Sequence, residues 1–184
     1  MGRWEPDAPG RLQQAAMALY AERGFDQTTV AEIAERAGLT ERTFFRYFAD
    51  KREVLFGGQR QLLEQFTKGV AEAPDSAGPL DAVSTALQQA AAFFDGGRDG
   101  SRQRQAVIDA NPALRERELS KRFALAAAMA DGLVSRGVAE TTARLTAEAG
   151  AAVFHLAFEQ WLADDKYDLA HFIRAAVADL KASM

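Results

Sequence analysis

The sequence of 184 residues is long enough for one domain or two small ones, and its 48% hydrophobic and 26% charged residues are typical of a folded protein with a core. Because it contains no cysteine, a disulfide framework, a thiolate metal site and a cysteine nucleophile are excluded, and a reducing cytoplasm is the expected compartment. The formal net charge of −4 argues mildly against nucleic-acid binding, so such a function would have to depend on local charge.

The spacing of apolar residues predicts an all-α fold. Hardly any segment alternates with a period of two, and apolar residues recur at intervals of three and four among many alanines. The N-terminus lacks the apolar segment of a signal peptide, and no run of about 18 apolar residues occurs, so neither secretion nor a membrane span is expected. Helices are expected at residues 9–23, 29–37, 40–48, 50–73, 80–95, 101–109, 112–136, 141–164 and 168–181.

The order of these helices predicts two domains. Residues 1–50 make three short helices with tight turns, and residues 51–184 make six longer helices. The fourth helix joins the two domains, and the sequence DKRE at its start is typical of a capping box. Its Gly57-Gly58 pair costs about 1 kcal/mol per glycine in a helix, which indicates either a place to bend or close packing against the first helix.

The second and third helices have the signature of a helix-turn-helix. Each is about two turns long, and the sequence AGL joins them, with Gly38 permitting the sharp reversal. Thr29 starts the second helix with the capping box TVAE, and Thr40 caps the third. A helix-turn-helix places its second helix in the major groove of DNA, so the third helix of this chain is the candidate for reading bases.

The third helix divides its aromatic side chains between two faces. At about 100° per residue, Phe44 and Phe48 fall together and are expected to pack on the second helix, whereas Arg42 and Arg46 fall on the opposite face. The exposed side chains suit DNA, because an arginine can bond a guanine and an aromatic ring can press on a thymine methyl group. The predicted base contacts are Arg42 and Phe45, and the predicted phosphate contacts are Thr40, Thr43, Tyr47 and Lys51.

Local charge supports contact with DNA at this end of the chain. From Arg36 to Arg52 the sequence has five basic and two acidic residues, a net charge of +3, which leaves −7 for the rest of the protein. A basic tip on an acidic body fits a protein that touches phosphate groups at one end only. Two alternatives stay open: a solvated basic face without a partner, and a helical interaction protein whose basic tip binds an acidic protein.

The segment TTVAEIAERAGLTERTFFRYFADKREVLF resembles the TetR family of bacterial transcriptional regulators, and the similarity covers about residues 10 to 57. The resemblance implies a homodimer, a palindromic DNA operator, a repressor released by a small effector, and an effector pocket in the C-terminal domain. The family's DNA-facing positions fall on Thr29, Thr43, Phe45, Tyr47 and Lys51.

Two residues depart from the family pattern in this segment. Phe45 stands where tyrosine is usual, so a hydroxyl contact to phosphate is absent. Glu41 places an acid at the DNA-proximal start of the third helix, where it suits a cytosine amino group but repels the phosphate backbone.

The helix over residues 141–164 is apolar on two opposite faces, so it must be buried on both. One face is expected to meet a second subunit, and the one-sided final helix can complete an isologous four-helix interface with it. The predicted interface residues are Leu145, Ala149, Val153, Leu156, Phe172 and Ala176.

The other face of that helix carries bulky aromatic side chains that are expected to point into the subunit. Beside alanine-rich helices they can leave an apolar cavity, although alanine can also simply let the helices approach closely. Together with the family's effector pocket, they predict a site for a small apolar effector, lined by Phe93, Phe94, Phe123, Met129, Phe154, Phe158 and Trp161.

The sequence RQRQAVIDANPALRERELSKRF is similar to a subgroup of these regulators that senses acyl-coenzyme A-like molecules. The similarity implies contacts between phosphate groups of such an effector and one or more of Arg102, Arg104, Arg115, Arg117 and Arg122. A solvated helix without a ligand is the alternative interpretation.

No motif for catalysis occurs. The sequence has neither a nucleophile elbow nor a phosphate-binding glycine loop, so no enzymatic activity and no cofactor are expected. His155 and Glu159 are spaced to share a metal ion on one helix, but no third ligand is evident, so no metal site is predicted.

Overall fold

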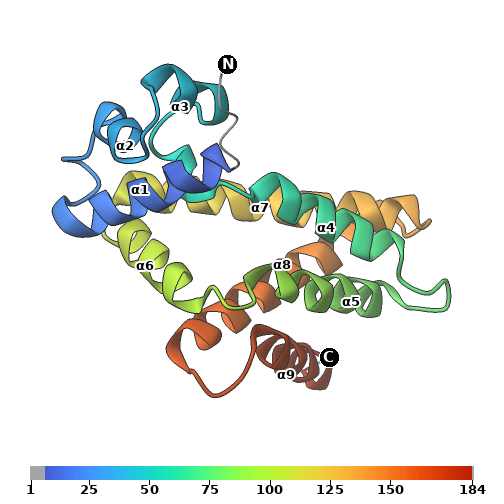
Figure 1. The fold of residues 1–184 in the computed structure, drawn as a ribbon. Helices are drawn as coiled ribbons and strands as arrows, with labels where there is room; N and C mark the ends of the chain where they lie inside the picture. The colour runs from blue at the N-terminus through green and yellow to red at the C-terminus, as the bar shows by residue number, and fades with distance from the viewer. Residues whose placement is uncertain (1–6, 184) are drawn as a thin grey trace. The chain divides into compact units, whose positions relative to one another are not determined.

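The computed structural model describes residues 7–183, and this part of the chain is helical without a β-strand, which confirms the all-α prediction (Figure 1). Two short 3-10 helices accompany the α-helices: η1 (Glu53–Phe56) and η2 (Ala92–Phe94). The α-helices are α1 (Ala8–Arg23), α2 (Val30–Arg36), α3 (Glu41–Tyr47), α4 (Gln59–Ala71), α5 (Pro79–Ala91), α6 (Arg98–Asp109), α7 (Pro112–Ser135), α8 (Glu140–Ala163) and α9 (Leu169–Ala182).

Contacts within the chain define two compact units. The N-terminal unit comprises Met1–Gly58 together with Arg102–Glu116, and the C-terminal unit comprises Gln59–Ser101 together with Arg117–Met184. The helices α6 and α7 therefore each contribute to both units. The boundary expected at residue 50 differs from this division, because the N-terminal unit continues to Gly58 and includes a second, distant segment.

The core of the N-terminal unit is built mainly from α1, on which α2 and α3 pack. Leu12 and Ala16 of α1 are fully buried, as are Ile33 of α2 and Phe44 of α3. The distant segment adds three more apolar side chains to the same core, those of Val107, Ile108 and Leu114. The three-helix head is thus completed by residues that lie sixty or more positions beyond the end of α3 at Tyr47.

The fourth helix differs from its prediction, because it begins at Gln59 and not at Asp50. The Asp50 carboxylate does accept hydrogen bonds from the backbone amides of Arg52 (2.8 Å) and Glu53 (3.1 Å), but only the short η1 follows it. The chain then leaves helical geometry at Gly57 and takes a left-handed conformation at Gly58 (φ 85°), which glycine adopts without strain. The glycine pair ends one helix and precedes another.

The C-terminal unit is organised around α5, which contacts α4, α8 and α9. Residues on most sides of α5 are buried, including Val83, Ala86 and Leu87. The α4 backbone approaches α5 closely at Gly69, where a Cβ atom would lie 2.7 Å from the Cα of Ala86. Among the described residues, no helix has the length and apolar character needed to cross a membrane.

Candidate nucleic-acid interface

The turn between α2 and α3 is held by backbone hydrogen bonds and by α1. Gly38 has a φ of 67°, and its amide donates to the carbonyl of Glu35 (2.9 Å), while the amide of Leu39 donates to the carbonyl of Ala34 (2.8 Å). The Arg11 guanidinium donates a hydrogen bond to the carbonyl of Ala37, so the turn is also connected to α1. The predicted reversal at Gly38 is confirmed, and the geometry is that of a helix-turn-helix.

Both helices of the motif begin at the predicted threonine caps. The Thr29 hydroxyl accepts from the amide of Glu32, and the Glu32 carboxylate accepts from the amide of Thr29 (2.9 Å), which completes the predicted capping box. The Thr40 hydroxyl accepts from the amide of Thr43 (3.2 Å) and lies 3.0 Å from the Thr43 hydroxyl. These caps define the two helix N-termini, which leave donor N–H groups suited to phosphate oxygen.

The aromatic residues of α3 are divided as predicted between core and surface. Phe44 and Phe48 are buried with exposed fractions of 0% and 7%, whereas Phe45 is 55% exposed and Tyr47 is 43% exposed. Phe45 packs edge-on against the ring of Phe44, with 5.4 Å between the centroids. Phe45 is therefore the one of these two phenylalanines of α3 that solvent or a partner can reach.

The basic side chains of this region are more engaged than their number in the sequence indicates. Arg36 forms two hydrogen bonds to Glu22 (2.5 and 2.6 Å), and Arg52 pairs with Asp50 (2.6 Å). The Arg36 hydrogen bond holds the pKa of Glu22 below its usual range, so this pair stays ionised near neutral pH. Both pairs are solvent-exposed, and their arginines contribute less to attraction of phosphate than free cations would.

The exposed cations on α3 itself are Arg42 and Arg46. Arg46 donates to the Tyr47 hydroxyl (3.1 Å) and lies over its ring at 4.8 Å from the centroid, so the two side chains form one polar group. Glu41, at the first position of α3, and Thr40, at the cap, are also exposed. The surface formed by residues 40–43 and 45–47 is the candidate interface, and it is formed almost entirely by one helix.

The side chain of Lys51, which was predicted to contact phosphate, is directed at the protein's own backbone. Its ammonium group donates to three backbone carbonyls in the loop between α1 and α2, those of Phe25, Asp26 and Thr28. Every N–H donor of the side chain thus has a partner within the N-terminal unit.

The aromatic residues predicted to line an effector site gather in the C-terminal unit. Phe94 has ring contacts to Phe154 (5.9 Å), Phe158 (5.3 Å) and Trp161 (6.2 Å), measured between centroids. Phe66 of α4 also joins them, edge-on to Phe154 at 5.5 Å. Phe66 was not among the predicted residues, because its position on α4 carries no signal of contact with α8. We call these five residues the aromatic cluster.

Three other predicted effector residues lie outside the cluster or at its edge. Phe123 is 67% exposed and has no ring contact with any described residue, so it lies outside the aromatic cluster. Phe93 is 47% exposed and touches the cluster through Phe94. Met129 is fully buried in the core of the C-terminal unit. The alanines around Phe123 left its direction undetermined, since they give α7 no single apolar face.

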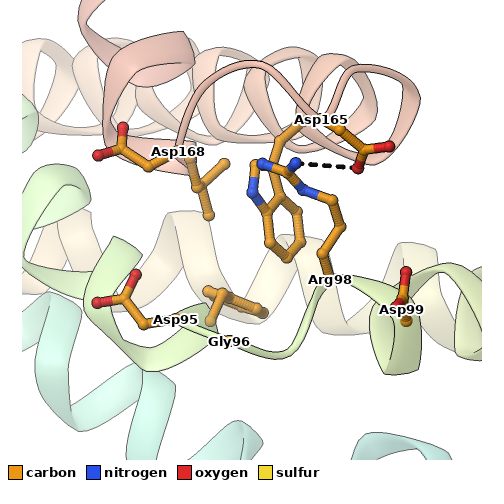
Figure 2. A pocket seen from close by; sticks show the side chains of 9 residues that line it. Asp95, Gly96, Arg98, Asp99, Asp165 and Asp168 are labelled. Carbon is orange, nitrogen blue, oxygen red and sulfur yellow. Dashed lines mark hydrogen bonds and ion pairs between the residues drawn. The ribbon is translucent and has the colours of Figure 1, made fainter.

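A pocket of about 400 Å³ opens beside the aromatic cluster (Figure 2). Arg98 pairs with Asp165 across it (3.1 Å), bonds the carbonyl of Tyr167 and lies 5.0 Å from the centroid of the Trp161 ring. The lining contains four aspartates and one arginine, and this excess of negative charge disfavours an anionic ligand group in the pocket. Its lining comprises Phe94, Asp95, Gly96, Arg98, Asp99, Trp161, Asp165, Asp168 and Leu169.

The predicted dimer residues divide between surface and core. Leu145 and Leu156 of α8 are 69% and 54% exposed, which is high for leucine in a folded unit. Val153 differs from its prediction, because it is 5% exposed and packs in the core, out of reach of a second subunit. The remaining three, Ala149 of α8 with Phe172 and Ala176 of α9, are partly buried.

Two other groups of polar side chains, the His155–Glu159 pair and Arg104, form neither a metal site nor a phosphate site among the described residues. His155 and Glu159 are paired at 3.3 Å, and no group of three metal-binding side chains occurs among the described residues. Arg104 donates through Nε to the carbonyl of Leu55 (2.7 Å) and lies over the Phe56 ring, so it serves the core of the N-terminal unit.

Comparison with known proteins agrees with this geometry. Residues 12–57 match the bacterial regulatory proteins of the tetR family, and residues 77–184 match the MftR C-terminal domain. The chain is 29% identical over 180 residues to the Mycobacterium tuberculosis protein named as the mycofactocin biosynthesis transcriptional regulator MftR, with 96% of this chain and 90% of that protein covered.

Two solved structures share the fold over nearly the whole chain. One is SmeT, the repressor of a multidrug efflux pump of Stenotrophomonas maltophilia, solved in complex with triclosan. It has a TM-score of 0.66 at 16% identity, and the match covers 95% of this chain and 90% of that one. Thermus thermophilus FadR, a TetR family transcriptional repressor in complex with lauroyl-CoA, has a TM-score of 0.58 at 25% identity and covers 96% and 94%. With a helix-turn-helix at its start and an MftR-type domain over more than half its length, the chain belongs to the TetR family of bacterial transcriptional regulators, which are not enzymes.

Proposed function

We propose that this protein is a repressor that binds a palindromic operator as a homodimer in the cytoplasm and is released by a small apolar effector. The observation that carries the DNA-binding part is the surface of α3, where Arg42, Phe45 and Arg46 are exposed on a helix fixed by its turn, its cap and its core. A short helix that presents arginine and an exposed aromatic ring is suited to the major groove.

The residues of this surface divide by the chemistry that they offer. Arg42 can bond the O6 and N7 acceptors of guanine, Phe45 can press on a thymine methyl group, and Glu41 can accept from a cytosine amino group. The Arg46–Tyr47 pair and the hydroxyls at the helix caps suit phosphate oxygens. The base contacts predict a site of mixed base composition, and the phosphate contacts predict that binding depends strongly on salt.

Selection of binding sites from random duplex DNA tests the proposal. The wild-type protein is expected to enrich an inverted repeat whose half-sites are centred about 34 Å, or one helical turn, apart, or a multiple of that distance. Binding to the selected duplex should weaken linearly with the logarithm of salt concentration, by fluorescence anisotropy. Enrichment of no sequence, with no binding to duplex DNA at low salt, would leave an acidic protein as the partner of the basic tip.

We further propose that the effector carries an acyl chain or a similar apolar group, which the aromatic cluster binds. The cluster combines five large rings from α4, η2 and α8, and Phe94 and Trp161 also line the adjoining pocket. The similarity to a repressor solved with lauroyl-CoA supports an acyl chain as the apolar group. Because the pocket beside the cluster is acidic, we expect the charged part of such a ligand to lie away from it.

Lauroyl-CoA is expected to quench the fluorescence of Trp161 and to lower operator affinity, whereas coenzyme A alone should do neither. The measurement uses a Trp4→Phe variant, in which Trp161 is the remaining tryptophan. Phe158→Ala should weaken the response because its ring contacts both Phe94 and Trp161, and Phe123→Ala, which removes an exposed ring, is the matched control. A lack of response in both fluorescence and affinity would exclude this acyl effector and leave the DNA-binding proposal intact.

A further inference from the structure

One ring of the aromatic cluster comes from outside the two helices that supply the others. Phe66 lies on α4 and three rings lie on α8, whereas Phe94 is the last residue of the short η2. Measured between centroids, the Phe94 ring lies 5.9 Å from Phe154, 5.3 Å from Phe158 and 6.2 Å from Trp161. A single side chain from a 3-10 helix therefore contacts every ring that α8 contributes to the cluster.

Phe94 belongs to a short segment, residues 92–98, which we call the strap. The amide of Gly97 donates to the carbonyl of Phe94 (3.1 Å), so this main-chain bond is local to the strap. Gly96 has a φ of 72°, a left-handed conformation that glycine adopts without strain. A Cβ atom at Gly96 would lie more than 4 Å from any described atom beyond its chain neighbours. The strap thus contains a glycine with open space around it, at which the chain can turn.

Arg98 holds the end of the strap against the loop between α8 and α9 (Figure 2). Its guanidinium pairs with the Asp165 carboxylate at 3.1 Å and donates to the carbonyl of Tyr167. It also lies 5.0 Å from the centroid of the Trp161 ring. The Arg98 side chain is 19% exposed, so water and salt screen its contacts less than those of a surface pair. The end of the strap is therefore fixed by three contacts of one side chain.

The closed position of Arg98 also carries a cost. Its Nε atom is buried and has no hydrogen-bond acceptor among the described residues. A buried donor without an acceptor costs free energy, which partly offsets what the ion pair and the cation–π contact contribute. The strap is therefore held in place less firmly than the number of Arg98 contacts indicates.

The pocket of about 400 Å³ lies beside the strap and the cluster together. Its lining includes Asp95, Gly96 and Arg98 of the strap, and it includes the rings of Phe94 and Trp161. The same two rings thus belong to the cluster and to the wall of the pocket. Movement of the Phe94 ring would open the pocket toward the rings of α8.

We propose that the strap is a gate for the aromatic cluster, in which Phe94 covers the α8 rings and the contacts of Arg98 hold the strap closed. The proposal rests on the effector site proposed above and adds the route by which an apolar molecule enters it. When the Arg98 contacts break, the strap turns at Gly96, and the Phe94 ring leaves the cluster. Because packed rings leave little space between them, an acyl chain needs such an opening to enter.

Quenching of Trp161 by acrylamide tests the gate without any effector. In the Trp4→Phe background Trp161 is the remaining tryptophan, and it is 4% exposed. Asp165→Ala breaks the ion pair but leaves the Arg98 guanidinium able to stay over the indole, so increased quenching reports movement of the strap. The variant is expected to populate the open strap about tenfold more, since a hydrogen bond between charged groups is lost, and to raise the Stern–Volmer constant accordingly.

Two further variants define the origin of that effect. Arg98→Met removes the same ion pair from the other side, so it should raise quenching at least as much, and the double variant with Asp165→Ala should add nothing to it. Asp95→Ala is the matched control, because Asp95 also lines the pocket but forms no ion pair among the described residues. Acrylamide is uncharged, so the change in pocket charge should leave quenching in this control at the wild-type value.

The kinetics of lauroyl-CoA binding, followed by stopped-flow fluorescence of Trp161, distinguish a gate from a ligand contact. A gate changes the barrier to entry and exit, so Asp165→Ala is expected to raise the association and dissociation rates by similar factors and to leave Kd nearly unchanged. Phe158→Ala, which removes a ring of the site itself, should mainly raise the dissociation rate and Kd.

The gate would be overturned by acrylamide quenching that stays unchanged in Arg98→Met and Asp165→Ala, or that rises equally in Asp95→Ala. Binding of lauroyl-CoA to the wild type at rates that Asp165→Ala leaves unchanged would overturn it as well. Asp165 is 74% exposed, so its substitution is expected to preserve folding, which circular dichroism checks. If no variant binds lauroyl-CoA, the effector proposal fails, whereas increased quenching in the two ion-pair variants still supports the strap as the moving cover of the cluster.

Discussion

Leu156→Glu is expected to convert the protein from a dimer into a monomer and to lower its affinity for the selected duplex by about 10² to 10⁴-fold, because two linked half-site contacts become one. The Leu156 side chain on α8 is 54% exposed, and Leu145 on the same helix is 69% exposed. Nothing in the described unit covers either leucine. A carboxylate in an interface built from such leucines would be buried without a partner. Light scattering gives the mass, and anisotropy with the selected duplex gives the affinity.

Leu119→Glu is the matched control for this substitution. Leu119 is also an exposed leucine, at 50%, but it lies on α7, which is not one of the predicted interface helices. The mass and the affinity of this variant should equal those of the wild type. A Leu156→Glu protein that keeps the dimer mass would show that α8 does not form the interface, whereas monomers from both substitutions would point to general destabilisation.

Arg42→Ala is expected to cost about 1–3 kcal/mol in binding free energy per half-site of the selected duplex and to relax discrimination at one base pair of each half-site. The side chain is exposed on α3 and, among residues 7–183, has no acidic partner like those of Arg36 and Arg52, so we expect its guanidinium to be available for a guanine edge. A palindromic site contains two such contacts, so a dimer loses this binding free energy at both half-sites. Affinities for duplexes with single base-pair changes identify the position read.

The control for Arg42→Ala is Arg60→Ala, which removes an exposed arginine from α4 in the C-terminal unit. It should change neither affinity nor sequence preference. If Arg42→Ala weakens binding equally on every variant duplex, Arg42 is a phosphate contact and the assignment of base reading to it is wrong.

The local features of this protein were predictable from its sequence because they depend on residues close together in the chain. The capping box at Thr29, the turn at Gly38 and the division of α3 into buried Phe44 and exposed Phe45 each follow from side chains within about four positions. The aromatic cluster was predicted for the same reason, since three of its five rings recur on one face of α8.

The features that the sequence did not reveal depend on contacts between distant residues. Arg36 pairs with Glu22, 14 positions away, and Lys51 bonds carbonyls 23 to 26 positions away. Fewer cations are therefore free at this surface than the five basic residues of the segment 36–52 indicate. At Gly57-Gly58 the sequence indicated a bend or close packing, whereas the helix breaks there, because a cap at Asp50 predicts where a helix can start but not how far it continues.

The sharing of α6 and α7 between the two units affects how this DNA-binding head could be inherited or transplanted. A fragment that ends at Gly58 lacks Val107, Ile108 and Leu114, so it exposes apolar surface on the side chains of α1 and η1 that share their core. A gene fusion that joins this head to a foreign C-terminal domain would lack the same three core side chains. A transplant of this head would therefore need to carry residues 102–116, or a matching stretch, together with it.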